Sequence, residues 1–122
     1  MTLANVFLYT WTELVDHEIR RALGDGLTEY GSRLALAEAI GWDVSLIKNY
    51  LGLKPMEELA GEPFFLITVA DLRRKSHKKI VVMVKRAIVK ALSDELGSMR
   101  AVARFLGKND KYLGQLMDEA RS

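Results

Sequence analysis

The amino-acid sequence predicts an all-α fold: a compact helical protein with two pseudo-repeated units. Apolar residues recur at helical spacing along most of the chain, and the sequence has no clear series of strand-like segments. In addition, residues 31–41 match residues 97–107 without a gap, at a constant offset of 66 positions. A repeat of this length predicts two copies of one helical unit, which we place at 1–69 and 70–122.

The first unit is expected to contain three helices. Residues 11–23 carry an amphipathic stripe, and Gly24 and Gly26 are expected to end this helix because glycine tolerates the left-handed conformation that closes helices. Two shorter helices are predicted at about 32–40 and 44–52, where a glycine and a proline stop the second one.

The segment that joins the two units is less regular. Residues 53–63 are expected to form a connector with a short helical turn near 56–60, and 64–72 is too short to distinguish a strand from a buried helix. The basic run at 73–79 contains five Lys or Arg in seven residues and is the predicted hinge between the units.

The second unit follows the same order of elements. A long helix is predicted at about 79–95, because apolar residues recur there at spacings of four. Helices at about 98–106 and 110–120 complete the unit. Each unit is therefore one helix, a turn, and a pair of short helices.

Charge is divided unequally between the two units. Residues 1–69 contain 5 basic and 10 acidic side chains, whereas residues 70–122 contain 13 basic and 6 acidic ones, so the small net charge of +2 conceals a strong asymmetry. Such a division points to different partners for the two halves, and the basic half is the better candidate for a polyanion such as DNA.

The paired short helices carry the same residue types at the same spacing. A small residue is followed after four positions by a glycine, and apolar residues stand six and nine positions beyond that glycine. These positions are Ala37, Gly41, Ile47 and Tyr50, and then Ala103, Gly107, Leu113 and Leu116. The alanine allows the two helices to cross closely, the glycine supplies positive φ in the turn, and Asp43 and Asn109 can cap the second helices.

This pattern resembles the helix-turn-helix DNA-binding superfamily, which includes phage repressors and Cro-like regulators, and it occurs twice in tandem. The resemblance covers about twenty residues in each half. It implies recognition helices near 43–51 and 109–118 that enter the major groove of DNA. Lys108, where the family usually has an apolar residue, and Gly114, inside the second recognition helix, depart from the pattern.

The resemblance and the charge pattern together suggest the residues that contact DNA. From the second motif they are Arg100, Arg104, Lys108, Asn109, Lys111 and Gln115; from the first, Ser45, Lys48 and Asn49; and from the basic run, Arg73, Arg74, Lys75, Lys78 and Lys79. An amide such as that of Gln115 suits a bidentate contact with adenine, and a lysine suits guanine or phosphate.

The two motifs are not expected to contribute equally. Acidic residues surround the first motif in the sequence and oppose phosphate binding, so the second motif is the expected main contact. The first motif is then either a weaker second reader or a surface for self-association or for another protein. A homodimer formed through the acidic half would supply the two-fold symmetry with which such proteins usually bind two DNA half-sites.

Other function classes find little support in the sequence. There is no cysteine, no nucleotide-binding or protease motif, and no apolar run long enough to cross a membrane. His17 and His77 are not at metal-ligand spacing; His17 is expected at the surface, and His77 is expected to add to the charge of the basic run. We therefore expect a cytoplasmic, nucleoid-associated protein that is not an enzyme, has no cofactor and does not enter a membrane.

The leading hypothesis is a small sequence-specific regulator of transcription that binds double-stranded DNA, with a phage or another mobile element as the suggested source. One alternative is an adaptor or inhibitor that uses the helix-turn-helix as a scaffold for binding RNA polymerase or another regulator, since fold does not settle function. A third hypothesis is an accessory factor in DNA packaging or replication, which should bind DNA as a higher oligomer.

Overall fold

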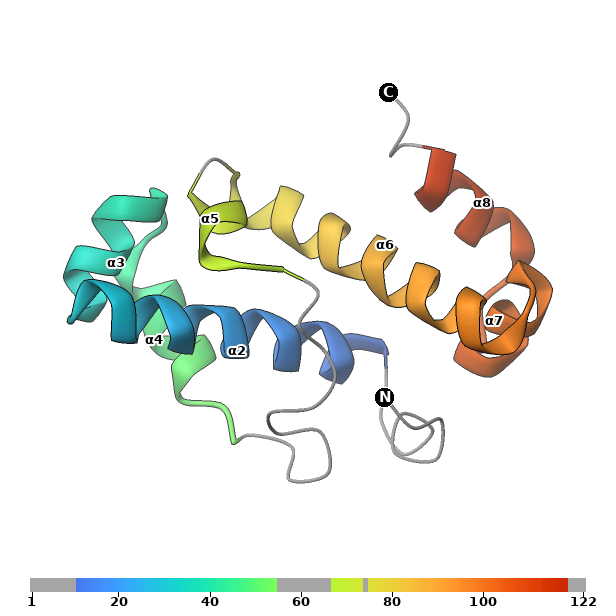
Figure 1. Cartoon of the computed structure of the whole chain (residues 1–122), viewed down its shortest axis with the longest axis horizontal. Coiled ribbons are helices and arrows are strands. Elements are labelled where there is room, and N and C mark those ends of the chain that lie inside the picture. The colour runs from blue at the N-terminus through green and yellow to red at the C-terminus, as the bar shows by residue number, and fades with distance from the viewer. Residues whose placement is uncertain (1–10, 55–66, 74, 119–122) are drawn as a thin grey trace.

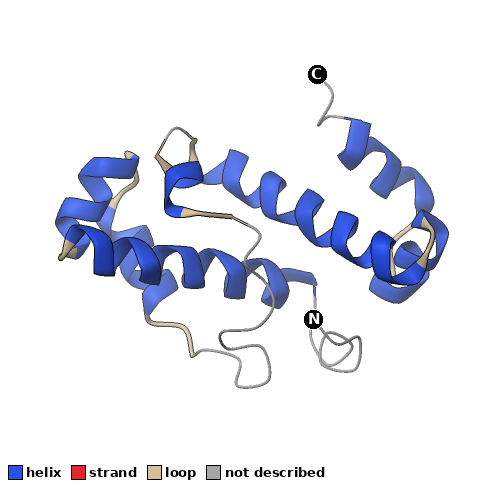
Figure 2. Cartoon of the chain, viewed as in Figure 1, coloured by secondary structure: helices blue, strands red, loops and turns tan. Residues whose placement is uncertain are grey.

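The computed structural model describes residues 11–54, 67–73 and 75–118, and these form helices joined by loops, with no strand among them (Figures 1 and 2). The all-α prediction is confirmed for this part of the chain. In chain order the helices are α2 (Trp11–Tyr30), α3 (Arg33–Ile40), α4 (Val44–Leu51), α5 (Val69–Leu72), α6 (His77–Leu96), α7 (Met99–Leu106) and α8 (Asp110–Asp118).

Two long helices form the centre of the molecule. Helix α2 packs against α6, and the two run in roughly opposite directions (Figure 1). The first hairpin (α3–α4) packs on α2, and the second hairpin (α7–α8) packs on α6. Because the central helices are antiparallel, the two hairpins lie at opposite ends of the long axis, and the start of α6 lies on the same side as the first hairpin.

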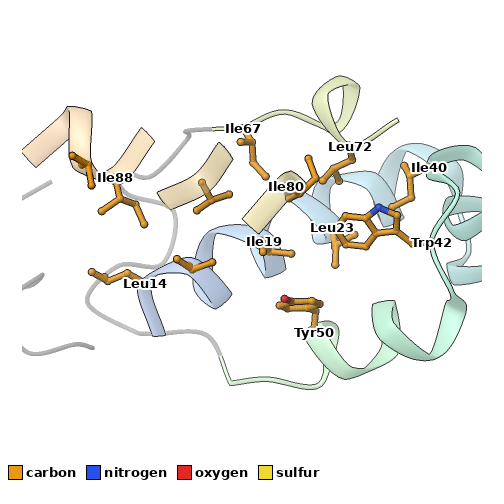
Figure 3. Packing of buried hydrophobic residues seen from close by; sticks show 14 of the residues in the cluster. Leu14, Ile19, Leu23, Ile40, Trp42, Tyr50, Ile67, Leu72, Ile80 and Ile88 are labelled. Atoms are coloured by element: carbon orange, nitrogen blue, oxygen red, sulfur yellow. The ribbon is translucent and has the colours of Figure 1, made fainter. Parts of the chain in front are cut away.

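Buried apolar side chains from both halves form one continuous cluster (Figure 3). Leu14, Ile19 and Leu23 of α2 and Ile80 and Ile88 of α6 are almost completely inaccessible to solvent. Spacings of five and four residues on α2 and of eight residues on α6 place them along one face of each long helix, which is the face that meets the other helix.

Helix α2 is longer than its sequence predicts. It continues through Gly24 and Gly26 and ends at Tyr30, before Gly31, which adopts a φ of 85°. The expected termination at the earlier glycines is wrong, because Gly26 is needed for packing instead: a Cβ atom there would lie only 2.7 Å from Cδ1 of Leu36. Glycine at this position lets α3 approach α2 closely.

The N-terminal helix trio (α2–α4) and the C-terminal helix trio (α6–α8) have matching bounds. Helices α2 and α3 begin and end 66 residues before α6 and α7, and α4 begins 66 residues before α8. Ser32 and Ser98 cap α3 and α7 by accepting the N–H three residues ahead, at 3.1 and 3.2 Å. Both serines follow a glycine with a φ near 85°.

The ambiguous segment contains one short helix. Ile67 is buried, and Thr68 begins the single turn of α5 with a capping box in which Asp71 is the reciprocal partner. Residues 64–66 and the predicted turn at 56–60 lie outside the described residues.

Candidate nucleic-acid interface

The two hairpins have the same turn geometry. Three residues separate the helices in each hairpin, and the first is a glycine in the left-handed region, with φ 79° at Gly41 and 69° at Gly107. The next residue donates its backbone N–H to the carbonyl oxygen of Ala37 at 3.2 Å or of Ala103 at 2.9 Å. Both alanines are buried, as expected for small residues where two helices approach closely.

The predicted caps of α4 and α8 are confirmed. Asp43 Oδ1 accepts the N–H of Ser45 at 2.8 Å, and Asn109 Oδ1 accepts the N–H of Tyr112 at 2.6 Å. The side-chain and backbone hydrogen bonds from Ser45 lower the pKa of Asp43, so that this carboxylate remains ionised at neutral pH. The N-cap of α4 therefore carries a negative charge where the N-cap of α8 is a neutral amide, and in α8 the acidic residue, Asp110, stands one position later.

The predicted DNA-binding side chains of the second hairpin all reach solvent. They are Arg100, Arg104, Lys108, Asn109, Lys111 and Gln115. Arg100 lies 3.8 Å from the carboxylate of Asp110, and the ammonium of Lys108 lies over the ring of Tyr112 at 5.9 Å. Exposed pairs of this kind contribute little to stability, so both cations can exchange these partners for a phosphate.

The first hairpin exposes Ser45, Lys48 and Asn49 on α4. The hydroxyl of Ser45 donates to Asp43 Oδ1 at 2.6 Å, which ties this side chain to the cap. Lys48 and Asn49 lie on the solvent-facing side of α4, opposite the buried Ile47 and Tyr50.

Half of the charge asymmetry of the sequence lies on the two central helices. Helix α2 contains five acidic and two basic residues, and α6 contains five basic and two acidic ones. Residues 33–51 of the first hairpin contain two of each sign, and residues 99–118 of the second contain four basic and two acidic residues. The hairpins therefore differ less in charge than the two halves of the sequence do.

The basic run at 73–79 lies against the first hairpin and the end of α2. The Arg73 guanidinium donates to Glu29 at 2.7 Å and lies over the ring of Tyr30. The indole of Trp42 donates to the carbonyl oxygen of Lys75 at 3.0 Å. The predicted hinge is thus tied to the N-terminal trio at both of these points, and Arg74 lies outside the described residues.

His77 has a specific partner that sequence reasoning missed. Its Nε2 is 2.6 Å from the hydroxyl oxygen of Tyr50, and its ring meets that of Trp42 edge-on, with 5.2 Å between centroids. Burial raises the pKa of Asp16, although the charge of His77 opposes this effect. Burial and Asp16 together raise the pKa of Tyr50 to about 12. One signal was present in the sequence: Trp42 and Tyr50 are aromatic, whereas their counterparts Lys108 and Leu116 are not.

Two polar residues of α2 are buried. His17 was expected at the surface, but only 7% of it is exposed, because it lies on a helix that packs on several sides. Glu18 is completely buried and accepts hydrogen bonds from Arg21 at 2.8 Å and from the N–H of Ile67 at 3.2 Å. Arg21 also donates to the carbonyl oxygen of Ile67. This pair therefore holds the chain that leads into α5 against α2.

The described residues contain no group of three or more acidic, His or Cys side chains placed to hold a metal ion. None of the described helices is long and apolar enough to cross a membrane. Comparison with protein-family models, with curated proteins and with solved structures gave no match.

Proposed function

We propose that this protein is a sequence-specific regulator of transcription that binds double-stranded DNA, with the second hairpin as its main DNA contact. The observation that carries this proposal is the set of four exposed cations on the second hairpin: Arg100, Arg104, Lys108 and Lys111. They accompany a tight turn and a capped helix, which is the local geometry of a helix-turn-helix.

Helix α8 has two different faces. Leu113 and Leu116 are buried against the rest of the trio, whereas Lys111 and Gln115 are exposed. A helix held by its apolar face leaves its polar side chains available to base edges in the major groove. In this arrangement Gln115 pairs with adenine, and Lys111 contacts guanine or phosphate.

Helix α7 supplies the phosphate contacts. Arg100 and Arg104 are exposed one turn apart on α7, the first helix of the hairpin, which in this arrangement crosses the DNA backbone. Contacts to phosphate supply most of the affinity and make binding strongly dependent on salt.

Fluorescence anisotropy of the full chain on a duplex of mixed sequence, measured at several salt concentrations, tests the proposal. We expect binding whose log–log salt slope has a magnitude of several units. Lys108→Gln/Lys111→Gln should reduce that magnitude by about 2, one unit for each lost phosphate contact. Lys85→Gln/Lys90→Gln, which removes two charges from the middle of α6, is the matched control.

Absence of binding to the duplex even at low salt would contradict the proposal and favour a protein-interaction module. If duplex binding is found, selection from a random library identifies the preferred site. Gln115→Ala should then relax the preference at one base pair, because it removes the amide that pairs with adenine.

A further inference from the structure

The basic run has a position that its place in the sequence does not suggest. It belongs to the basic half of the chain, but α6 is antiparallel to α2, so the start of α6 lies beside the first hairpin and its end carries the second. The contact between Tyr50 and His77, at 2.6 Å, joins α4 directly to the first residue of α6.

Aromatic side chains of the first hairpin hold the run in place. The indole N–H of Trp42 donates a hydrogen bond to the carbonyl oxygen of Lys75, and its ring packs against that of His77. The hydroxyl of Tyr50 is hydrogen-bonded to Nε2 of His77. Both aromatic side chains are at most 9% exposed, and they point into the buried cluster (Figure 3). The run is therefore attached to the first hairpin by groups that are themselves firmly packed.

The second hairpin has no equivalent of these two aromatic residues. Sixty-six positions after Trp42 stands Lys108, and 66 positions after Tyr50 stands Leu116. The second hairpin thus has a lysine of its own in the turn, whereas the first has a tryptophan that holds a lysine-rich segment. Both ends of the molecule therefore carry cationic side chains. In the second hairpin they belong to the hairpin itself, whereas beside the first hairpin they belong to the basic run that Trp42 contacts.

The run changes the charge of the first end. Residues 33–51 alone are balanced, with two charges of each sign. Lys78 and Lys79 are exposed in the first turn of α6, and Lys75 is half-buried beside them. Arg73 is paired with Glu29 and adds little. Residues 33–51 taken together with Lys75, Lys78 and Lys79 therefore have an excess of three positive charges, against two for residues 99–118 of the second hairpin.

We infer that α4 and the first turn of α6 together form a second surface for duplex DNA. Its members are Ser45, Lys48, Asn49, Lys78 and Lys79. Asn49 stands at the position equivalent to Gln115 and carries the same amide group, which can pair with adenine in the major groove, so the occupant is duplex DNA, as proposed for the second hairpin. This inference rests on the proposed function, and it means that one chain contacts DNA at two places.

Salt titration of anisotropy tests the role of the run. Lys78→Gln/Lys79→Gln should reduce the magnitude of the log–log salt slope by about 1 to 2, as expected for lost phosphate contacts. Lys85→Gln/Lys90→Gln removes the same charge from the same helix and should change the slope by less than half as much. Equal slopes for the two variants would overturn the inference, and circular dichroism checks that both remain folded.

Directed cleavage then locates the surface on the duplex. The chain has no cysteine, so Lys48→Cys, Lys111→Cys and Lys90→Cys each accept a single cleaving iron chelate. On a duplex of about 40 base pairs, which exceeds two half-sites one helical turn apart, we expect cleavage from residues 48 and 111 at separate positions. Cleavage from residue 48 no stronger than that from residue 90 would overturn the inference.

The failures of the two proposals are distinguishable. If the unmodified protein does not bind the duplex, the proposed function fails and the inference fails with it. If Lys108→Gln/Lys111→Gln weakens binding but Lys78→Gln/Lys79→Gln does not, only the inference fails. Tighter binding to single-stranded RNA of the same length than to the duplex would also overturn it.

Discussion

The N-terminal and C-terminal helix trios share their helix bounds and their turns, but they fill their interiors differently. One feature is common to both: Arg20 and Arg86, 66 residues apart, each donate Nε to a backbone carbonyl at the end of the following hairpin, that of Leu53 or Leu116. An arginine thus binds a carbonyl oxygen just beyond the end of α4 in the first trio and one in the last turn of α8 in the second.

The contact between the long helix and the next helix uses different sizes of residue. In the N-terminal trio Gly26 lies under Leu36, whereas the equivalent positions in the C-terminal trio hold Leu92 and Val102, both fully buried. The N-terminal trio thus pairs a glycine with a leucine, whereas the C-terminal trio pairs a leucine with a valine at the same two positions. The comparison shows that the same helix bounds tolerate different packing, provided that the facing residues change together.

The long helices also differ at their centres. Glu18, completely buried, stands where α6 has the buried Val84. The carboxylate is held by Arg21 and by the backbone of Ile67, which belongs to the segment entering α5. The C-terminal trio has an apolar residue at the same place, so this buried charge serves an attachment that is particular to the first trio.

The largest expected effect comes from breaking that attachment. Arg21→Leu takes from the buried Glu18 its guanidinium partner, and we expect the free energy of unfolding to fall by about 3 kcal/mol. Chemical denaturation followed by circular dichroism measures this loss. Arg86→Leu, a comparable truncation on α6, should cost less, because position 84 carries no charge to be left without its partner; a larger loss in Arg86→Leu would contradict this explanation.

A smaller effect tests the packing difference. Gly26→Leu introduces the residue found at position 92 and should destabilise the protein by about 2 kcal/mol, because even its Cβ atom would crowd Leu36. The double variant Gly26→Leu/Leu36→Val reproduces the pair at 92 and 102 and should recover part of that loss. If the double variant is as unstable as the single one, the two trios do not pack their helices in an interchangeable way.

The smallest effect concerns the tyrosine that holds the basic run. Tyr50→Phe removes the hydrogen bond to His77 and should lower the free energy of unfolding by about 1 kcal/mol at neutral pH. The equivalent residue, Leu116, has no polar atom in its side chain, so Tyr50→Phe makes the N-terminal trio more similar to the C-terminal trio at this position. Thermal unfolding at several pH values measures the effect.

The pH dependence of this effect has a definite sign. The pKa of Tyr50 is raised in the folded protein from 10.0 to about 12, so the tyrosine contributes stability that is complete below pH 10 and is lost as the pH rises from 10 to about 12. Tyr50→Phe should reduce the loss of stability in that interval. An unchanged alkaline transition in the variant would show that another group is responsible.

Most of the local structure could be predicted from the sequence. The bounds of α3, α4 and α7 agree with prediction to within one residue at each end, because their capping serine or aspartate and their closing glycine lie next to the helix itself. The exposed cations of α7 and α8 could also be predicted, since the helical period places them opposite the apolar stripe. The role of DNA as the partner stays a prediction that the experiments above test.

Where the sequence failed, the cause was a contact between residues distant along the chain. The termination at Gly26 was wrong because its true role depends on Leu36, and His17 is buried by the packing of other helices around α2. The basic run was expected to join two units, yet Trp42 and Tyr50 hold it against the first hairpin. No pattern in the run itself indicates these partners.

By itself, the sequence determined the all-α class, the order of the helices and the turns of both hairpins. Caps, left-handed glycines and helical periodicity are satisfied by atoms only a few residues apart, so short stretches encode them completely. Only the tertiary structure decided that α2 and α6 are antiparallel and that the basic run belongs to the first end. The direction in which two helices pack depends on the fit of side chains along their whole length, which no short stretch contains.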